Sequence, residues 1–261
     1  MWEEGDAAVG DLLQSPVFGP VDRIQEPLPV SNWWADRGIA LSSTELNRSA
    51  LFGLAALRWE NDEPDWVTFL WHVLAWGVVG DYRNASKIVA SVADAEQRAR
   101  LNGVLRSAAE ASRRGDIRSA YTAIHGRVAR LGPAFFSKFL YLTSDREAPG
   151  PRCLILDSHV SAAVFTLTGR EYWKETAATY ERFCGEVHRW SELFGAPDDV
   201  IEFRLYQFGR LIASSRWRWL HAEASLYREG RQRVGFDDIA ERQARLMGWT
   251  TGRDDRGDTS V

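Results

Sequence analysis

The stretch that decides the fold is LGPAFFSKFL at 131–140, followed by a loop and then by CLILDSHV at 153–160. In the first segment Gly132 can turn the chain, a proline is tolerated at the first helical position, and an apolar run follows. The second segment is an apolar run that ends at Asp157, where a helix N-cap residue belongs. The stretch therefore predicts two helices, with Lys138 early in the first and Asp157 at the head of the second.

Lys138 and Asp157 are nineteen positions apart and have complementary chemistry. A cation near the start of a helix is disfavoured by the macrodipole, so the Lys138 amine should lose its proton more easily than a free lysine. A capping carboxylate stays ionised at neutral pH, because the amide donors that it accepts favour its charged form. A Schiff-base nucleophile and its partner carboxylate need this pairing. The alternative is structural, with a helix-capping aspartate and a solvated lysine.

Lysine is scarce in this chain, which favours the chemical interpretation of Lys138. The chain has 32 lysines and arginines, and its lysines are Lys87, Lys138 and Lys174. Arginine therefore supplies nearly all the positive charge. Because arginine cannot lose its proton or form a Schiff base, a lysine among phenylalanines indicates a specific need for an amine.

The segment resembles the core of the helix-hairpin-helix DNA glycosylases, and specifically their bifunctional 8-oxoguanine branch without an iron–sulfur cluster. In that branch a hairpin of the type L-P-G-V-G-T-K carries the nucleophilic lysine, and V-D-x-H-V carries an aspartate nineteen residues later. Lys138 and Asp157 fall on these two residues, and His159 and Val160 follow the aspartate as in the family.

The resemblance implies further site residues, with some departures. Ala134 and Phe136 replace the two hairpin glycines, and Gly132 lies two residues early. The expected DNA contacts of the hairpin region are Gly132, Ala134, Phe136, Ser137 and His159. The residues expected to enter the gap left by a flipped base are Tyr82, Arg83 and Asn84, although Asn84 could instead cap a helix. The expected base pocket contains Trp76, Gln207 and Phe208, and core packing is the alternative for Phe208.

The pattern of apolar residues predicts an all-α fold, with two packed helical subdomains, a helix-hairpin-helix-like element and a cleft between the subdomains. We expect an irregular N-terminal lead-in over 1–30 because of its prolines, a glycosylase-like domain over 31–250, and a disordered polar tail over 251–261. We expect helices from 42–45 to Leu57, from 63–65 to about Gly77, from about Ala85 to 129 with breaks near Gly103 and Gly115, over 171–194, from Asp198 to about Tyr227, and over 236–247.

Composition limits the classes of function. Two cysteines without CxxC spacing argue against a structural zinc or iron–sulfur site and fit a reducing compartment. No signal peptide or membrane span is evident. The net charge of −4 does not advertise nucleic-acid binding, but eight arginines against two acidic residues between Arg98 and Leu131 form a local basic block. The alternative for this block is a solvated helix face.

Together these features predict a monomeric, cytoplasmic, nucleoid-associated enzyme that needs no cofactor. Its partner would be double-stranded DNA with a damaged or modified base, with 8-oxoguanine as the first candidate by resemblance. It would excise the base through a lysine Schiff base and then cleave the strand by β-elimination. The alternatives are a glycosylase against modified bases of foreign DNA, a non-catalytic helical DNA-binding protein on the same scaffold, and a helical protein unrelated to DNA.

Overall fold

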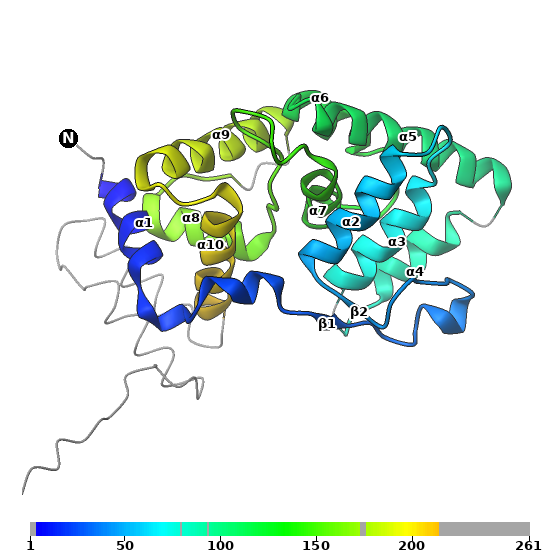
Figure 1. Ribbon diagram of the computed structural model, residues 1–261, viewed down its shortest axis with the longest axis horizontal. Coiled ribbons are helices and arrows are strands. Elements are labelled where there is room, and N and C mark those ends of the chain that lie inside the picture. The colour runs from blue at the N-terminus through cyan, green and yellow to red at the C-terminus, as the bar shows by residue number, and fades with distance from the viewer. Residues whose placement is uncertain (1–3, 79, 93, 173–175, 214–261) are drawn as a thin grey trace, which may run out of the picture. The chain divides into compact units, whose positions relative to one another are not determined.

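The computed structural model describes residues 4–78, 80–92, 94–172 and 176–213, and these residues form an all-α fold, as predicted (Figure 1). The α-helices of this part of the chain are α1 (Glu4–Gln14), α2 (Arg48–Trp59), α3 (Trp66–Gly77), α4 (Arg83–Ala90), α5 (Ala95–Arg113), α6 (Ile117–Ile124), α7 (Pro133–Thr143), α8 (Ser158–Thr168), α9 (Ala177–Phe194) and α10 (Asp198–Ile212). Short 3-10 helices occupy Pro16–Phe18, Val21–Gln25 and Ala35–Arg37. One antiparallel pair of two-residue strands joins β1 (Leu28–Pro29) to β2 (Glu45–Leu46).

The chain divides into two compact units. One consists of the described residues of Met1–Arg23, His159–Glu171 and Phe203–Val261, and the other of those of Ile24–Ser158 and Tyr172–Glu202. The predicted helix at 236–247 and the tail at 251–261 lie outside the described residues. The cleft expected between two subdomains stays a prediction.

Helix α3 forms the centre of the larger unit, as its nearly continuous apolar sequence predicts. It begins after Asp65, whose carboxylate accepts a hydrogen bond from the Thr68 amide at 3.0 Å. Its buried residues run without a break from Phe69 to Ala75. Helices α2 and α7 pack against it, and Figure 1 shows the three side by side. The interior helix therefore supports α7, the helix that carries Lys138.

Several predicted boundaries were wrong. The helix predicted over 171–194 begins only at Ala177, and three other differences have local reasons. Helix α2 begins at Arg48 rather than at 42–45, because the Asn47 side chain caps it at the Ala50 amide (2.8 Å) while Glu45–Leu46 pairs as a strand. Helix α5 runs through Gly103, where a glycine on the exposed side costs about 1 kcal/mol but does not stop a helix. The predicted break at Gly115 is confirmed, with a φ of 74°.

The third correction concerns the N-terminal region, where helix α1 occupies Glu4–Gln14 of the lead-in that was expected to be irregular. Ala8, Val9 and Leu12 are buried, and their spacing places them on one helical face. The prolines on which the expectation rested follow the end of this helix. None of the described helices has the length and apolar character to cross a membrane.

Within the smaller unit, α8 and α10 approach each other closely at Gly209. A Cβ atom at Gly209 would collide with the backbone carbonyl of His159, in the first turn of α8. Because the obstacle is backbone, it cannot move aside as the end of a flexible side chain can. Glycine at this position therefore lets α10 pack against the start of α8, which directly follows Asp157.

We predict that Gly209→Ala destabilises the protein by about 2 kcal/mol or more, because an extra methyl group in a closed contact forces the helices apart. Urea denaturation followed by circular dichroism measures the effect. The matched control is Gly103→Ala, also inside a helix but with open space around its Cβ position, which should stabilise by up to about 1 kcal/mol. Equal stability of Gly209→Ala and the wild type would show that the helices are not in close contact.

Candidate active site

Lys138 is the sixth residue of α7, and its amine points back along the helix. Side chains in a helix lean toward its N-terminus, so the Lys138 Nζ atom reaches the carbonyl of Ala134 and donates to it at 2.8 Å. Its stem passes the end of α3, where a Cβ at Gly77 would lie 3.0 Å from Lys138 Cδ. Glycine at this position of α3 leaves room for the lysine side chain.

Asp157 is positioned by the buried extended run Cys153–Leu156. No strand among the described residues pairs with this run, so its backbone polar groups need other partners. The Leu156 amide donates to Ser137 Oγ at 3.1 Å, and the Tyr180 hydroxyl donates to the Leu154 carbonyl at 2.6 Å. Ser137 precedes Lys138 and Leu156 precedes Asp157 in the chain. The Ser137–Leu156 hydrogen bond therefore holds the two charged residues side by side.

The structure brings Lys138 and Asp157 together, as the sequence predicted. Lys138 Nζ lies 3.8 Å from Asp157 Oδ2, and the two side chains are only 13% and 12% exposed. This distance allows electrostatic attraction but is longer than a hydrogen bond. The Lys138 amine is thus held by Ala134 and attracted, but not bonded, to Asp157.

The pKa of Lys138 is lowered from its ordinary value, and burial is the main cause. The negative charges of Asp157 and Glu202 oppose this change, whereas the positive charge of Arg48 adds to it. The direction agrees with the prediction from the sequence, but the principal cause is removal from water rather than the helix macrodipole. A lowered pKa makes the neutral, nucleophilic amine more available.

A second buried charge pair, Arg48 with Glu202, was not anticipated from the sequence. Arg48 Nη1 lies 2.7 Å from Glu202 Oε2 and donates to the Tyr141 hydroxyl at 3.1 Å. Tyr141 in turn donates to Asp199 Oδ2 at 3.3 Å, and Arg146 pairs with the same oxygen at 2.8 Å. Arginine at the head of a helix and a glutamate within another look like surface charges in sequence, so only the fold reveals this network.

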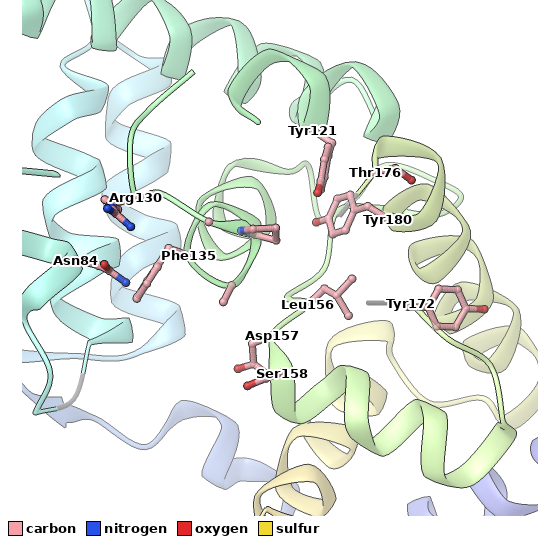
Figure 2. A pocket seen from close by; sticks show the side chains of 13 residues that line it. Asn84, Tyr121, Arg130, Phe135, Leu156, Asp157, Ser158, Tyr172, Thr176 and Tyr180 are labelled. Atoms are coloured by element: carbon pink, nitrogen blue, oxygen red, sulfur yellow. The ribbon is translucent and has the colours of Figure 1, made fainter. Parts of the chain in front are cut away.

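A pocket of about 190 Å³ adjoins the pair on the side of the α7 N-terminus (Figure 2). Asp157 lines it, and Lys138 reaches its edge through the bonded Ala134 carbonyl. Figure 2 shows Tyr121 and Tyr180 at one side, with ring centroids 5.2 Å apart. The remaining lining residues are Asn84, Arg130, Gly132, Pro133, Phe135, Leu156, Ser158, Tyr172 and Thr176.

The expected DNA contacts of the hairpin region divide into two groups. Gly132 and Ala134 line the pocket. Phe136 and Ser137 are fully buried inside the helix packing, so neither can contact DNA in this conformation, and that expectation was wrong. The reason is that α7 is regular from Pro133 onward, so the family's hairpin glycine positions lie within its first turns. Ser137 has the different role of holding Leu156.

The three residues expected to enter the DNA gap have different surroundings. Tyr82 stacks on Trp33 with ring centroids 4.7 Å apart, and Arg83 forms an exposed pair with Asp81 at 2.6 Å. Asn84 lines the pocket and is the second residue of α4, whose N-cap position is Tyr82. The alternative that Asn84 caps this helix is therefore wrong.

Of the expected base-pocket residues, Trp76 lies in the larger unit and Gln207 and Phe208 in the smaller one. Arg48 lies 5.8 Å above the Trp76 ring. The Gln207 amide donates to the Phe18 carbonyl at 3.3 Å and accepts from Arg204, so its polar groups are already engaged. Phe208 is 3% exposed and belongs to the core, which was the alternative to a place in the base pocket.

His159 is half-buried, and its ring meets Tyr206 edge-on at 5.7 Å. The structure therefore gives His159 a packing contact within the smaller unit, and its predicted contact with DNA stays a prediction.

Three of the eight arginines in the predicted basic block pair with carboxylates. Arg98 pairs with Asp65 at 2.7 Å, Arg100 with Glu96 at 2.9 Å, and Arg118 with Glu181 at 2.6 Å. Arg127 and Arg130 are exposed, and within the described ranges neither forms an ion pair. These two arginines of the loop before α7 are therefore available to DNA phosphates. Among the described residues no cluster of histidine, cysteine and acidic groups could hold a metal ion.

We predict that Ser137→Ala lowers the free energy of unfolding by about 1–3 kcal/mol, because it leaves the buried Leu156 amide without an acceptor. Urea denaturation measures the loss. Ser107→Ala is the matched control, since its hydroxyl bonds the Gly103 carbonyl on the exposed side of α5 and should matter by less than about 0.5 kcal/mol. Equal losses in the two variants would mean that Ser137 does not hold the run.

Comparison with known families gives one match. A family model described as "Putative 8-oxoguanine DNA glycosylase OGG-like protein" matches residues 11–206, which include Lys138, Asp157 and the whole pocket. Searches of the curated proteins and of the solved structures find no match. The match extends over more than half of the chain and supports a DNA glycosylase role. The chain belongs to the family of OGG-like 8-oxoguanine DNA glycosylases.

Proposed function

We propose that this protein is a DNA glycosylase with abasic-site lyase activity, and that Lys138 is its nucleophile. The observation that carries the proposal is a mostly buried lysine with a lowered pKa, 3.8 Å from a mostly buried aspartate. Perturbed titration beside a pocket is typical of catalytic groups. Membership of the glycosylase family supports the assignment of this chemistry to DNA.

In the proposed reaction the neutral Lys138 amine attacks C1′ of an extruded nucleotide. A bond forms between Nζ and C1′, the glycosidic bond breaks, and the base leaves with the bonding electrons and gains a proton. Asp157 stabilises the positive charge that develops on the sugar and accepts the lysine proton. Opening of the sugar ring gives a Schiff base, loss of a C2′ proton breaks the C3′–O bond, and hydrolysis of the imine frees Lys138.

The pocket beside Asp157 suits part of the nucleotide backbone. Asn84 of α4 and Arg130 of the loop before α7 offer side-chain donors, and Ala134 in the first turn of α7 adds a backbone amide. Arg130 has a φ of 68°, a conformation that non-glycine residues adopt only where the surroundings enforce it. We propose that this loop presents Arg130 to a phosphate near the extruded nucleotide.

8-Oxoguanine is the first candidate for the excised base, on the strength of the family. Modified bases of foreign DNA are the alternative substrate class. A panel of duplexes, each with one lesion or modified base, separates the two. Release of 8-oxoguanine alone supports repair, and release of a modified base from otherwise intact DNA supports the alternative.

A non-catalytic DNA-binding protein is the second candidate function, favoured by the acidic composition and by the altered hairpin, in which Ala134 and Phe136 replace the two glycines. The two functions differ in covalent chemistry. Borohydride reduces a Schiff base to a stable adduct, so an enzyme would form a covalent band on an abasic-site duplex. A binding module would show salt-dependent DNA affinity without such a band.

We predict that Lys138→Gln abolishes the borohydride-trapped adduct, because no other side chain would supply the amine at C1′. Denaturing gel electrophoresis of a labelled abasic-site duplex measures the adduct. Lys87→Gln removes an exposed lysine of α4 and should leave the band unchanged. An adduct of normal yield with Lys138→Gln would show that Lys138 is not the nucleophile.

We predict that Asp157→Asn slows base release on the order of 10²-fold, because the developing positive charge loses its carboxylate. DNA affinity should change little, since the residue meets the sugar rather than the phosphates. Single-turnover base release and a binding isotherm measure the two effects. Asp116→Asn, which alters the N-cap of α6, is the matched control and should keep the wild-type rate. Unchanged turnover in Asp157→Asn would contradict its assigned role.

A further inference from the structure

The buried pair of Arg48 and Glu202 takes no direct part in the proposed reaction. Their side chains are only 5% and 1% exposed, and the nitrogen–oxygen distance is 2.7 Å. Burying both ions costs desolvation that an apolar pair of similar size would avoid. Such a pair is weak evidence for stability, so these charges need another explanation.

Two helices connect the pair to Lys138. Tyr141, which accepts a hydrogen bond from Arg48, lies three residues after Lys138 in α7 and therefore on the same face of that helix. In α3, Trp76 lies under the Arg48 guanidinium, and the next residue, Gly77, contacts the Lys138 stem. The end of α3 and one turn of α7 therefore lie next to both the Arg48–Glu202 pair and the Lys138 side chain.

The charged groups that act on Lys138 are Asp157, Glu202 and Arg48. Asp157 and Glu202 favour the ammonium form, and Arg48 favours the neutral amine. Burial raises the pKa of Tyr141 to about 12, so its hydroxyl stays neutral, and Asp199 beyond it is paired with Arg146. Glu202 and Arg48 therefore act on Lys138 in opposite directions.

We propose that Arg48 and Glu202 are positioning residues that balance the charge around the Lys138 amine, Arg48 opposing and Glu202 favouring its ammonium form. Burial raises the pKa of Glu202, and Arg48 counteracts this effect. Arg48 remains charged at all working pH values. The inference rests on the proposed function only in taking Lys138 as the nucleophile.

The decisive variant is Glu202→Gln, which leaves the Arg48 charge unopposed and should move the titration midpoint of Lys138 to lower pH. The double variant Arg48→Met with Glu202→Gln removes both charges and should bring the midpoint back toward that of the wild type. Arg48→Met alone should not lower the titration midpoint of Lys138. We expect the midpoints of the two single variants, Arg48→Met and Glu202→Gln, to differ by at least about one pH unit. This pair of single variants still tests the inference if the double variant does not fold.

The measurement uses the scarcity of lysine in this chain. Protein labelled with ¹³C at lysine Cε gives signals from only Lys87, Lys138 and Lys174, and Lys138→Gln identifies the signal of interest. NMR titration of the full-length, DNA-free protein then reports the Lys138 midpoint without any need for activity. Glu181→Gln, which breaks the exposed pair with Arg118, is the matched control and should leave the midpoint unchanged.

The outcomes separate the inference from the proposed function. Coincident midpoints in the wild type, Glu202→Gln and Arg48→Met would overturn the inference, even if the wild type forms a normal borohydride adduct. Midpoints that move as expected, in a protein that forms no adduct, would support the charge balance and contradict the glycosylase proposal. If the charge balance and the proposed function both hold, the yield of borohydride adduct should rise at a lower pH in Glu202→Gln than in the wild type.

Discussion

The candidate site depends on one short hydrogen bond between a helix and an extended segment. The Leu156 amide donates to Ser137 Oγ, and the residues that follow these two in the chain are Asp157 and Lys138. Within the part of the chain that the structure describes, no strand pairs with the extended run, and the side chains of Ser137 and Tyr180 bond its buried backbone groups. Because an unsatisfied buried amide is costly, this contact fixes the distance between two side chains that lie nineteen residues apart.

Burial, more than helix position, gives Lys138 its unusual properties. A macrodipole is worth about 0.3–1 kcal/mol and fades beyond the first turn, whereas burial lowers the pKa of a lysine wherever in the helix its amine is removed from water. Lys138 is the sixth residue of its helix and 13% exposed, so desolvation is the larger effect. The two buried carboxylates, Asp157 and Glu202, limit this effect, and Arg48 supports it. The pKa of the Lys138 amine therefore depends on a balance among charged groups from several parts of the fold.

Charge that is visible in composition does not have to be available for binding. The arginines of α5 and α6 look like a basic surface in the sequence, but Arg98, Arg100 and Arg118 already pair with carboxylates. Two exposed arginines, Arg127 and Arg130, lie in the loop before α7. Arg130 lines the pocket, and Arg127 precedes it in the chain by three residues. An acidic protein can hold DNA through such a small group, because a few phosphate contacts are enough to position a duplex.

Local patterns were sufficient for the all-α class, for α3 as an interior helix, and for helix starts at Pro133 and Ser158. Side-chain spacing and capping chemistry act over a few residues, so these features are readable without a fold. The lysine–aspartate pair was also readable, from the two helix starts, from the scarcity of lysine and from the resemblance to a family. Tertiary packing decided the burial of Phe136 and Ser137, the engagement of Gln207 and the meeting of Arg48 with Glu202. Those properties depend on which distant residues remove water from a side chain, and no local pattern records that.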